Sequence, residues 1–315
     1  MNYGRMALWM LLLASLAACT RHAGEAAPSA TAAAPPPRPA SAAPAPDPGE
    51  GPRLTLSPDN VHIEYRVLGH GEPAVILIHG WACDANYWNE QFDALKSRYT
   101  VVAVNLAGHG GSASNRTDWS IANYAADVAA VARQLPNPRL VLVGHAMGAT
   151  VALAATPLIG SRVIGIIAVD ALRSVGQPPL APREVEQRVA PFRADFVGET
   201  RKLVSESLFP RNANRVLVQK VAYDMSLEPP AVAVPSLQAL LSLDLAALLP
   251  AIHVPVYAIN SDLLPTDAAR IRKSIPNFTL DVLDHSGHFL MLEDPARFNP
   301  LLMKDLAALA AQPSH

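Results

Sequence analysis

The sequence predicts an α/β fold in which helices cover both faces of a doubly wound, mostly parallel sheet. Two observations lead to this prediction. Short, continuous apolar runs bounded by glycine, aspartate or asparagine recur along residues 54–312, and helical patterns lie between them. Runs of this length are typical of strands buried on both faces of a parallel sheet. Their alternation with helices places those helices on the two faces of the sheet.

The expected strands follow in chain order. Residues 61–67 alternate polar and apolar side chains, as a strand with one exposed face does. The other strands are continuous apolar runs at residues 74–78, 100–104, 140–143, 163–169, 254–259 and 278–283. Among the helical patterns, residues 121–135 are the clearest, and we expect Asp127 and Arg133 on the polar side of that helix.

One interval interrupts the alternation. Residues 171–252 are rich in helical patterns and contain no clear strand. This indicates a helical cap of about residues 172–252, inserted after the sixth strand of the sheet. The cap carries many apolar side chains, including Phe192, Phe196 and Phe209. They favour an apolar ligand, although amphipathic helices also show such faces in order to reach the core.

The first 53 residues predict no folded domain. Residues 1–19 have the features of an export signal, with Arg5 near the start, a short apolar run and small residues before Cys19. The run is too short for a membrane-spanning helix, which needs about 20 apolar residues. Residues 20–53 are rich in alanine and proline and nearly devoid of large apolar side chains, so we expect an extended tether.

The end of the signal, Leu-Ala-Ala-Cys, resembles the bacterial lipobox, whose cysteine becomes the lipidated first residue of the mature protein. The resemblance implies an envelope protein that is bound to the membrane through a lipid anchor on Cys19. By the sorting rules of such lipoproteins, Thr20 favours the outer membrane, facing the periplasm. Several acyl chains hold a protein stably on a membrane, whereas a single chain does not.

Other classes of function are not supported by the sequence. The formal net charge is −2, so we expect no nucleic-acid partner. The sequence contains no P-loop, no cysteine–histidine zinc spacing and no dinucleotide-binding fingerprint. We therefore expect neither a metal nor an organic cofactor. No motif places Cys83 beside a basic group, and a small buried cysteine is the common case.

Residues 140–150 predict a buried strand, a sharp turn and the start of a helix. Gly144 and Gly148 flank position 146 as the glycines do in the G-x-S-x-G nucleophile elbow, where the strained turn leaves no room for side chains. Ala146 stands where that motif has its serine. A methyl group cannot attack a carbonyl, so this position decides what the site can do.

Four motifs in order resemble those of the α/β-hydrolase family, in its capped bacterial form, over nearly all of residues 54–312. They are His79-Gly80-Trp81 after a strand, residues 105–112 with Asn105 in place of the usual aspartate, the turn around Ala146, and Gly287-His288-Phe289 followed by residues 291–295. The resemblance implies a Ser-His-Asp type site that hydrolyses a carboxylic ester or similar acyl bond.

The resemblance also implies residue roles. It makes His288 the general base, and His285, which no glycine precedes, the weaker candidate. It implies an oxyanion hole formed by the backbone N–H groups of Trp81 and Met147. His145 precedes Ala146 as a histidine often does in this family, where it usually packs beneath the turn.

Two aspartates are candidates for the acid that orients His288. Asp170 follows the run at residues 163–169, and Asp262 follows the next strand along the chain. Most family members carry the acid after strand seven, but aligning Ser261 with the end of that strand places Leu264 at the acid position. Some relatives, including certain haloalkane dehalogenases, carry it after strand six. We therefore prefer Asp170 and keep Asp262 as the alternative.

Ala146 leaves three interpretations open. The chain is a disarmed serine hydrolase, a pseudoenzyme that binds a small apolar ester or acid, or a protein that uses His288 and its acid as a base without a nucleophile. Loss of a triad nucleophile typically lowers kcat about 10⁶-fold. We therefore expect ester hydrolysis by this sequence to be close to undetectable.

Overall fold

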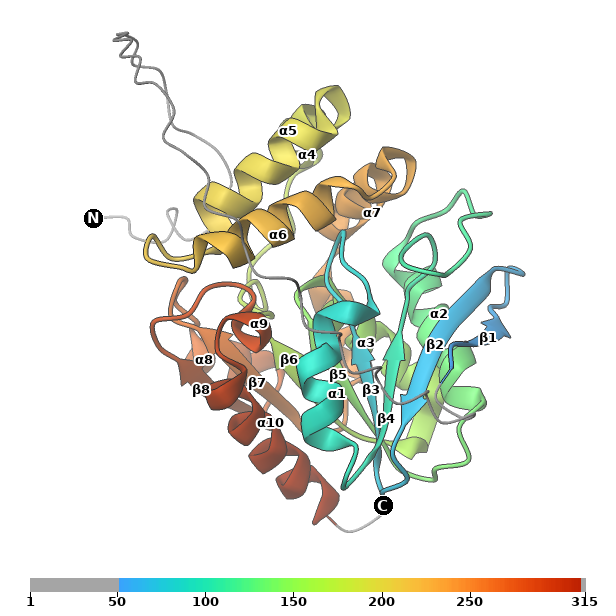
Figure 1. Cartoon of the computed structure of the whole chain (residues 1–315). Helices are drawn as coiled ribbons and strands as arrows, with labels where there is room; N and C mark the ends of the chain where they lie inside the picture. The colour runs from blue at the N-terminus through green and yellow to red at the C-terminus, as the bar shows by residue number, and fades with distance from the viewer. Residues whose placement is uncertain (1–50, 313–315) are drawn as a thin grey trace, which may run out of the picture.

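An eight-stranded sheet forms the centre of the computed structural model, which describes residues 51–312. The strand order is β1-β2-β4-β3-β5-β6-β7-β8, with β1 and β2 antiparallel to their neighbours and the others parallel (Figure 1). The strands are β1 (Arg53–Leu56), β2 (His62–Leu68), β3 (Ala74–Ile78), β4 (Thr100–Val104), β5 (Leu140–His145), β6 (Val163–Val169), β7 (Val256–Ser261) and β8 (Phe278–Leu283). The predicted α/β fold is confirmed.

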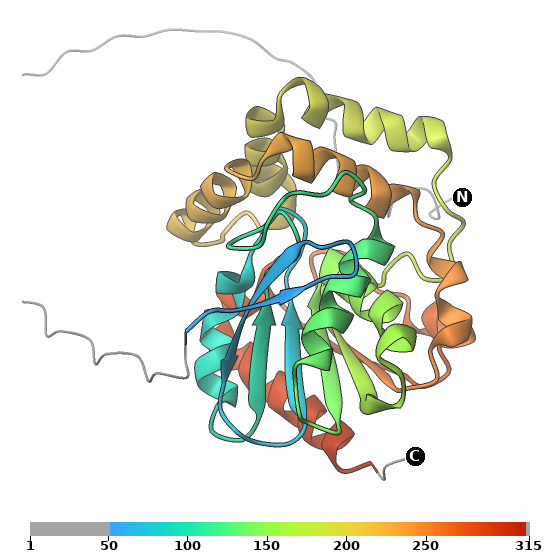
Figure 2. The same cartoon turned by 90° about the vertical axis from the view of Figure 1, so that its right-hand side faces the viewer.

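Ten α-helices accompany the sheet in the described residues. They are α1 (Asn89–Leu95), α2 (Ile121–Arg133), α3 (Met147–Ile159), α4 (Pro182–Ala194), α5 (Phe196–Leu203), α6 (Arg215–Ser226), α7 (Pro230–Ser242), α8 (Ala268–Ser274), α9 (Leu290–Glu293) and α10 (Pro295–Ala310). Helices α1 and α10 pack on one face of the sheet, and α2 and α3 pack on the other (Figures 1 and 2). Strands β3, β4 and β5 are buried throughout, since their apolar side chains meet helices on both faces.

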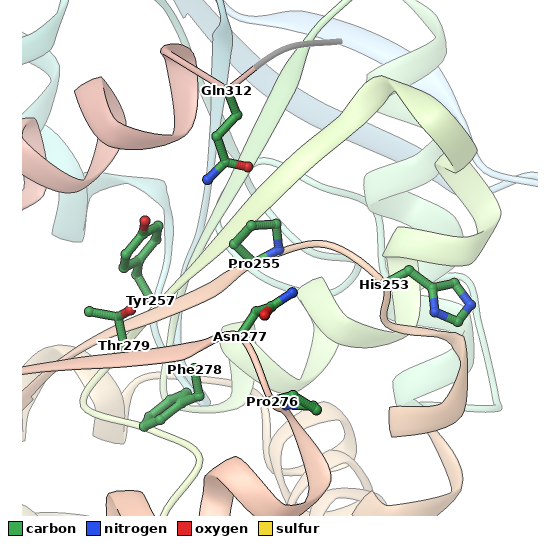
Figure 3. A pocket seen from close by; sticks show the side chains of 8 residues that line it. All are labelled: His253, Pro255, Tyr257, Pro276, Asn277, Phe278, Thr279 and Gln312. Carbon is green, nitrogen blue, oxygen red and sulfur yellow. The ribbon is translucent and has the colours of Figure 1, made fainter. Parts of the chain in front are cut away.

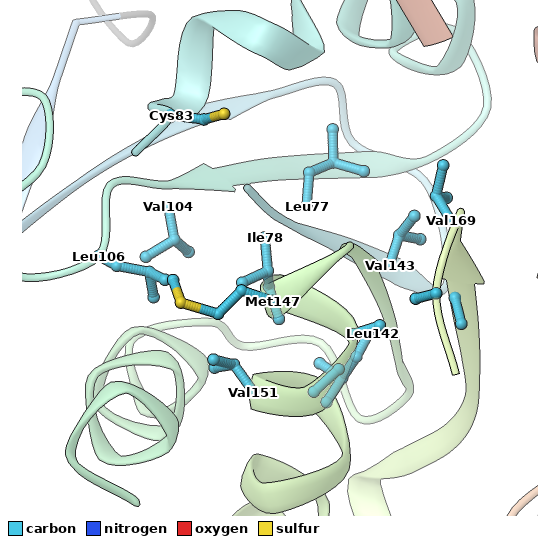
Figure 4. Close-up of a cluster of buried hydrophobic side chains, with 14 of the residues drawn as sticks. Leu77, Ile78, Cys83, Val104, Leu106, Leu142, Val143, Met147, Val151 and Val169 are labelled. Carbon is cyan, nitrogen blue, oxygen red and sulfur yellow. The ribbon is translucent and has the colours of Figure 1, made fainter. Parts of the chain in front are cut away.

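Side chains from the central strands converge beneath the turn that joins β5 to α3 (Figure 4). Met147, the first residue of α3, points into this cluster beside Leu106 and Val104. Ile78 of β3 and Val151 of the next helical turn lie in the same cluster. Burial of each such side chain contributes roughly 1.5–3 kcal/mol, so the packing holds the turn firmly at the carboxyl end of the sheet.

Helices α4 to α7 follow β6 and lie across the carboxyl ends of the strands (Figures 1 and 2). This cap is attached to the loop after β3 through Trp81. The indole Nε1 of Trp81 donates a hydrogen bond of 2.7 Å to the carbonyl of Ala233 in α7. Its ring meets the rings of Phe192 and Phe196 edge-on, with centroids 5.5 and 6.1 Å away. The cap therefore covers the end of the sheet where Ala146 lies.

The strand boundaries differ from expectation at β1, β2, β5 and β7. Strand β2 lies one residue later than expected, and β5 extends two residues further, to His145. Strand β1 was not expected, because it is a four-residue edge strand whose Leu54 and Leu56 are exposed. Strand β7 begins at Val256 and ends at Ser261, two residues later than expected at both ends. Pro255 precedes it and has no N–H to donate, which is consistent with a start at Val256.

The expected exposure of Asp127 is wrong. Asp127 is fully buried in α2 and accepts hydrogen bonds from both terminal nitrogens of Arg116, at 2.9 and 2.6 Å. Arg116 also pairs with Asp59 at 2.8 Å. A buried carboxylate is tolerated when a cation and hydrogen bonds compensate for lost water. The partner lies outside the helix, so helical spacing alone could not reveal the pair.

The expected signal of residues 1–19, with Cys19, and the tether up to residue 50 lie outside the described residues. Within the described residues, no single helix is long and apolar enough to cross a membrane. Helix α7 and the short helical segment Leu245–Ala251 reach that length and composition only together, with a bend of 73° between them.

Candidate active site

The turn between β5 and α3 places Ala146 in a strained conformation. Ala146 has φ 48° and ψ −112°, a region that L-residues rarely occupy. A Cβ atom at Gly144 would lie 2.3 Å from the carbonyl carbon of Gly148, and one at Gly148 would lie 2.4 Å from the carbonyl oxygen of Ile78. Both positions therefore require glycine. The Ala146 N–H donates to the carbonyl of Val169 at 3.0 Å, which ties the turn to β6.

His288 and Asp170 form a hydrogen-bonded pair, although 118 residues separate them in the chain. His288 lies in the loop after β8, and its Nδ1 is 2.7 Å from Oδ2 of Asp170, the residue that follows β6. The His288 side chain is 21% exposed. When Nδ1 carries the hydrogen and donates it to the carboxylate, Nε2 has a free lone pair. That nitrogen can accept a proton from a bound group.

Asp170 is almost fully buried, and its second oxygen is saturated with donors. Oδ1 accepts hydrogen bonds from the N–H and the hydroxyl of Ser261 and from Arg173 Nη2, each at 2.7 Å. Burial alone would raise the pKa of Asp170. The hydrogen bond and charge of His288, followed by the Arg173 guanidinium, outweigh burial and hold that pKa well below its usual range. The carboxylate therefore stays ionised at neutral pH.

The alternative acid, Asp262, makes a different contact. Its Oδ1 accepts a long hydrogen bond of 3.4 Å from the Ser286 N–H. Within the described residues it has no hydrogen bond to His288. The structure thus brings Asp170 to His288 and leaves Asp262 beside the loop backbone.

The two backbone N–H groups expected in the oxyanion hole lie on segments that pack together. The position of a Cβ built on Gly80, which precedes Trp81, is 3.5 Å from the Ala146 methyl carbon. Met147 is the first residue of α3, where an N–H has no partner within the helix and the helix dipole is positive. Among the described residues, neither N–H donates a hydrogen bond to another group. Such a pair of donors can bind a negative oxygen.

His145 lies under the His288 ring and is neutral. Its Nε2 is 2.9 Å from the His288 carbonyl oxygen, which accepts a hydrogen bond from it, and the two ring centroids are 4.6 Å apart. Burial, together with the nearby His288, lowers the pKa of His145 to about 3. His145 therefore supports the backbone of His288 and carries no charge at neutral pH.

Local hydrogen bonds explain why Asn105 stands where the family motif usually has an aspartate. Its Nδ2 donates to Oε1 of Glu64 at 2.7 Å, and its Oδ1 accepts from the Ala85 N–H at 2.8 Å. An aspartate at this position would set a second carboxylate against Glu64. The amide avoids this repulsion and still accepts the backbone N–H.

Cys83 is a buried thiol rather than a reactive one. Its sulfur lies 3.3 Å from the carbonyl of Trp81, and burial raises the pKa of the thiol well above its usual value. His285 is exposed and pairs with Asp284 at 3.8 Å. Neither side chain is in contact with the pair formed by His288 and Asp170.

Two partners of Asp170, Arg173 and Ser261, were not expected from the sequence. Arg173 lies three residues after Asp170, in a turn where Asp170 and Leu172 both have positive φ. A basic residue three positions after a candidate acid could have been a signal for this ion pair. Nothing local in the sequence shows that Ser261, from the next strand, faces the same carboxylate.

A cleft of about 460 Å³ lies away from this site (Figure 3). It is lined by His253, Pro255, Tyr257, Pro276, Asn277, Phe278, Thr279 and Gln312. Apart from Gln312, which follows α10, the lining residues stand at the amino ends and first residues of β7 and β8, whereas His288 follows the carboxyl end of β8. Ligands of open α/β sheets bind at the carboxyl ends of the strands. We therefore assign no role to this cleft. In the described part of the chain, no group of three histidine, cysteine or carboxylate residues is placed to hold a metal.

Comparison with known proteins identifies the family. Residues 75–301 match the sequence model of the alpha/beta hydrolase family. The chain belongs to this family. Strands β4 to β8, the strained turn at Ala146 and the loop of His288 all lie within the matched residues.

Individual relatives agree with this assignment. An uncharacterised protein of Mycobacterium tuberculosis is 29% identical over 257 residues, covering 74% of this chain and 75% of that protein. A protein of Caulobacter sp. with a proposed carbamate hydrolase activity is 28% identical over 257 residues, covering 77% and 95%. A thermophilic esterase of Thermogutta terrifontis superposes with a TM-score of 0.73 at 21% identity, covering 83% and 100%. At that identity, the superposition shows the common fold alone.

Proposed function

We propose that this α/β-hydrolase binds a small apolar carboxylic ester, or a similar acyl compound, at the site of Ala146 and His288. As the sequence stands, the site holds that ligand without forming an acyl-enzyme. The observation that supports this most is the 2.7 Å bond between His288 and an ionised Asp170, which is present although position 146 lacks a nucleophile. The named activities of relatives, carbamate and ester hydrolysis, favour an acyl ligand.

The same geometry describes how a serine at position 146 would act. Its hydroxyl oxygen would bond to the ligand's carbonyl carbon while His288 Nε2 takes the hydroxyl proton. The N–H groups of Trp81 and Met147 would stabilise the negative oxygen, and Asp170 would stabilise the imidazolium. His288 would then protonate the leaving alkoxide, and water would cleave the acyl-enzyme by the same route. With Ala146, the first bond cannot form, and no acyl-enzyme is made.

The chemistry of the surrounding side chains supports an apolar ligand. Trp81, Phe192 and Phe196 place three aromatic rings where the cap meets the loop after β3. Their edge-on packing buries apolar surface and leaves the backbone N–H of Trp81 as a polar group of that loop. A site of this kind suits a carbonyl oxygen at one end and a hydrocarbon chain at the other.

Replacing Ala146 with serine tests the proposal. We expect Ala146→Ser to release a burst of p-nitrophenol from p-nitrophenyl butyrate and to react with a fluorophosphonate probe. The double variant Ala146→Ser/His288→Ala keeps the hydroxyl and removes the base, so it should show neither. A folded Ala146→Ser protein with no burst and no labelling would contradict the proposed ester site and favour a pseudoenzyme.

A second candidate function is base catalysis without a nucleophile. It is favoured by the lone pair of His288 Nε2, on a side chain that is 21% exposed and backed by the ionised Asp170. In that reaction Nε2 would take a proton from carbon next to a ligand's carbonyl, and the oxyanion hole would hold the enolate oxygen. Exchange of that carbon's hydrogen with deuterated water, lost in His288→Ala, would support this function over simple binding.

We also propose that the protein is held on the bacterial outer membrane by lipid on Cys19. The support is the Leu-Ala-Ala-Cys sequence at the end of the signal and the alanine- and proline-rich tether after it. Such a tether would let the hydrolase domain work in the periplasm at some distance from the lipid.

A further inference from the structure

The loop that carries His288 is bound on both sides by one carboxylate. The Gly287 N–H donates to Oε2 of Glu293 at 3.0 Å, and the Phe289 N–H donates to Oε1 at 3.1 Å. Glu293 is the last residue of α9, so this short helix carries the acceptor for the loop that precedes it. The two neighbours of His288 are thereby attached to one rigid group.

Two further backbone groups of the loop, both of His288, are bound as well. The His288 N–H donates to the carbonyl of Leu208 in the cap at 2.8 Å, and the His288 carbonyl accepts from His145 at 2.9 Å. A Cβ at Gly287 would lie 2.8 Å from Glu293 Oε1, so the carboxylate packs closely against the loop. Three consecutive N–H groups thus have acceptors, and two of these acceptors belong to Glu293.

We propose that Glu293 is a positioning residue, whose carboxylate fixes the main chain on both sides of His288 and so keeps the imidazole bonded to Asp170. That this position of the imidazole matters for catalysis rests on the proposed function. An ionised carboxylate carries no hydrogen, so each of its two oxygens can accept a hydrogen bond from one of the N–H groups. A glutamine would place an NH₂ group opposite one of the two N–H donors, which breaks half of the arrangement.

The electrostatics of Glu293 argue against a role in folding alone. The pKa of Glu293 is raised to about 7, chiefly by burial and to a smaller extent by Asp170. The two backbone N–H groups and His288 act in the opposite direction and lower it. Because the folded-state pKa lies above the unfolded value, this group favours folding most when protonated, and that contribution is lost as pH rises from about 4.5 to 7. At pH 8 the ionised carboxylate therefore costs stability.

Other charged neighbours of Glu293 pair among themselves. Asp294, the residue before α10, lies 3.6 Å from Arg297, which also pairs with Asp284 in the loop after β8. From the segment before α1, Tyr87 contributes a ring face to Phe289, 5.7 Å between centroids, and no charge at neutral pH. Asp294 provides a matched control, because it caps α10 through the Arg297 N–H and has no hydrogen bond to the loop of His288.

The test uses the full chain with Ala146 in place and reads the Nδ1 proton of His288 by NMR. A proton held between an imidazole and a carboxylate is strongly deshielded and exchanges slowly with water. We expect this resonance in the unmodified protein, its absence in His288→Ala, and its loss or broadening in Glu293→Gln. Asp294→Asn should retain it. At pH 8 the melting temperature of Glu293→Gln should equal or exceed that of the unmodified protein.

The activity readout uses the Ala146→Ser background. There, Glu293→Gln should lower kcat for p-nitrophenyl butyrate about 10²-fold with KM changed less than about threefold, since a small misplacement of a catalytic group has this effect. Asp294→Asn should leave both unchanged. If Ala146→Ser is inactive while the resonance behaves as expected, the positioning role stands and the proposed function fails.

Three outcomes would overturn the positioning role. The resonance could be absent from the unmodified protein, or it could persist in Glu293→Gln with full rescued activity. Alternatively, Glu293→Gln could lose the resonance together with a lower melting temperature at pH 8, which indicates a structural role. Should that variant fail to fold, Glu293→Asp replaces it. The aspartate side chain is one methylene shorter and cannot reach both N–H groups, so a folded Glu293→Asp protein with undiminished signal and activity would also refute the role.

Discussion

Asp170→Asn, made in the Ala146→Ser background, tests which carboxyl group orients His288. The change turns one oxygen of the side chain into an NH₂ group. Ser261 and Arg173 direct three donors at Oδ1, so the amide oxygen has to stay there. The NH₂ group must then face His288 Nδ1. Because the NH₂ group is a donor, Nδ1 can form a hydrogen bond with it only as an acceptor, without a hydrogen of its own. The hydrogen moves to Nε2, and Nε2 can no longer take a proton from the nucleophile.

The expected loss is large because it affects the transition state and not the binding of substrate. In a serine protease, the equivalent change lowers kcat about 10⁴-fold, which corresponds to about 5.4 kcal/mol at about 1.36 kcal/mol per tenfold. Asp262→Asn is the matched control. Asp262 accepts one long hydrogen bond of 3.4 Å from Ser286, and the amide oxygen of asparagine can still accept it. We expect a loss of less than about threefold there.

The assay is the kcat and KM of each double variant on p-nitrophenyl butyrate, with active sites counted by fluorophosphonate labelling. Unfolding curves for each protein exclude a loss of folded material. If Asp170→Asn lowers kcat only tenfold or less, the expected shift of the His288 hydrogen from Nδ1 to Nε2 is refuted. An inactive Asp262→Asn with a tolerant Asp170→Asn would show that the acid comes from β7 after a rearrangement of its loop.

Three further predictions concern single residues. Gly148→Ala should lower the free energy of unfolding, measured by urea denaturation, by about 3 kcal/mol, because the new Cβ would lie 2.4 Å from the Ile78 carbonyl oxygen. Helix propensity alone would raise that free energy by about 1 kcal/mol, and such a gain would contradict the clash. Burial, with a smaller effect of Asp84, raises the pKa of Glu228 to about 8. The protonated side chain therefore favours folding at low pH, and this contribution is lost between about pH 4.5 and 8. Glu228→Gln should raise the melting temperature at pH 8.5 and leave it unchanged below pH 4.5. Cys19→Ser should move the protein out of the membrane fraction and abolish palmitate incorporation, and an unmodified protein that takes up no label would disprove the lipid anchor.

Much of the fold could be predicted because its strands are buried on both faces. Such strands are continuous apolar runs, and the short intervals between them leave little choice of topology. The exposed edge strand β1 carries no such run, so its sequence does not distinguish it from a loop. The buried Asp127 shows a related limit, since a polar residue on a helix is expected to face water until its distant partner, Arg116, is known.

The candidate site could be predicted in part, and the limit lies in long-range geometry. Local motifs single out Ala146 and His288, because a glycine-flanked turn and a glycine–histidine loop are short sequence patterns. The choice between Asp170 and Asp262 depends instead on which strand end faces the loop after β8. That is decided by the positive φ of Asp170 and by the Ser261 donors from β7, which no local pattern encodes.

The energetic costs retained around Ala146 favour a site that still binds a ligand. Alanine at φ 48° is strained by about 1–2 kcal/mol relative to glycine. The carboxylate of Glu293 is held ionised above pH 7 against its own burial. Single substitutions, to glycine at position 146 or to glutamine at position 293, would relieve each cost. Both costs fall at the turn of Ala146 and the loop of His288, the two segments that form the proposed site. They therefore support retained recognition of an acyl ligand at a site that lacks its nucleophile.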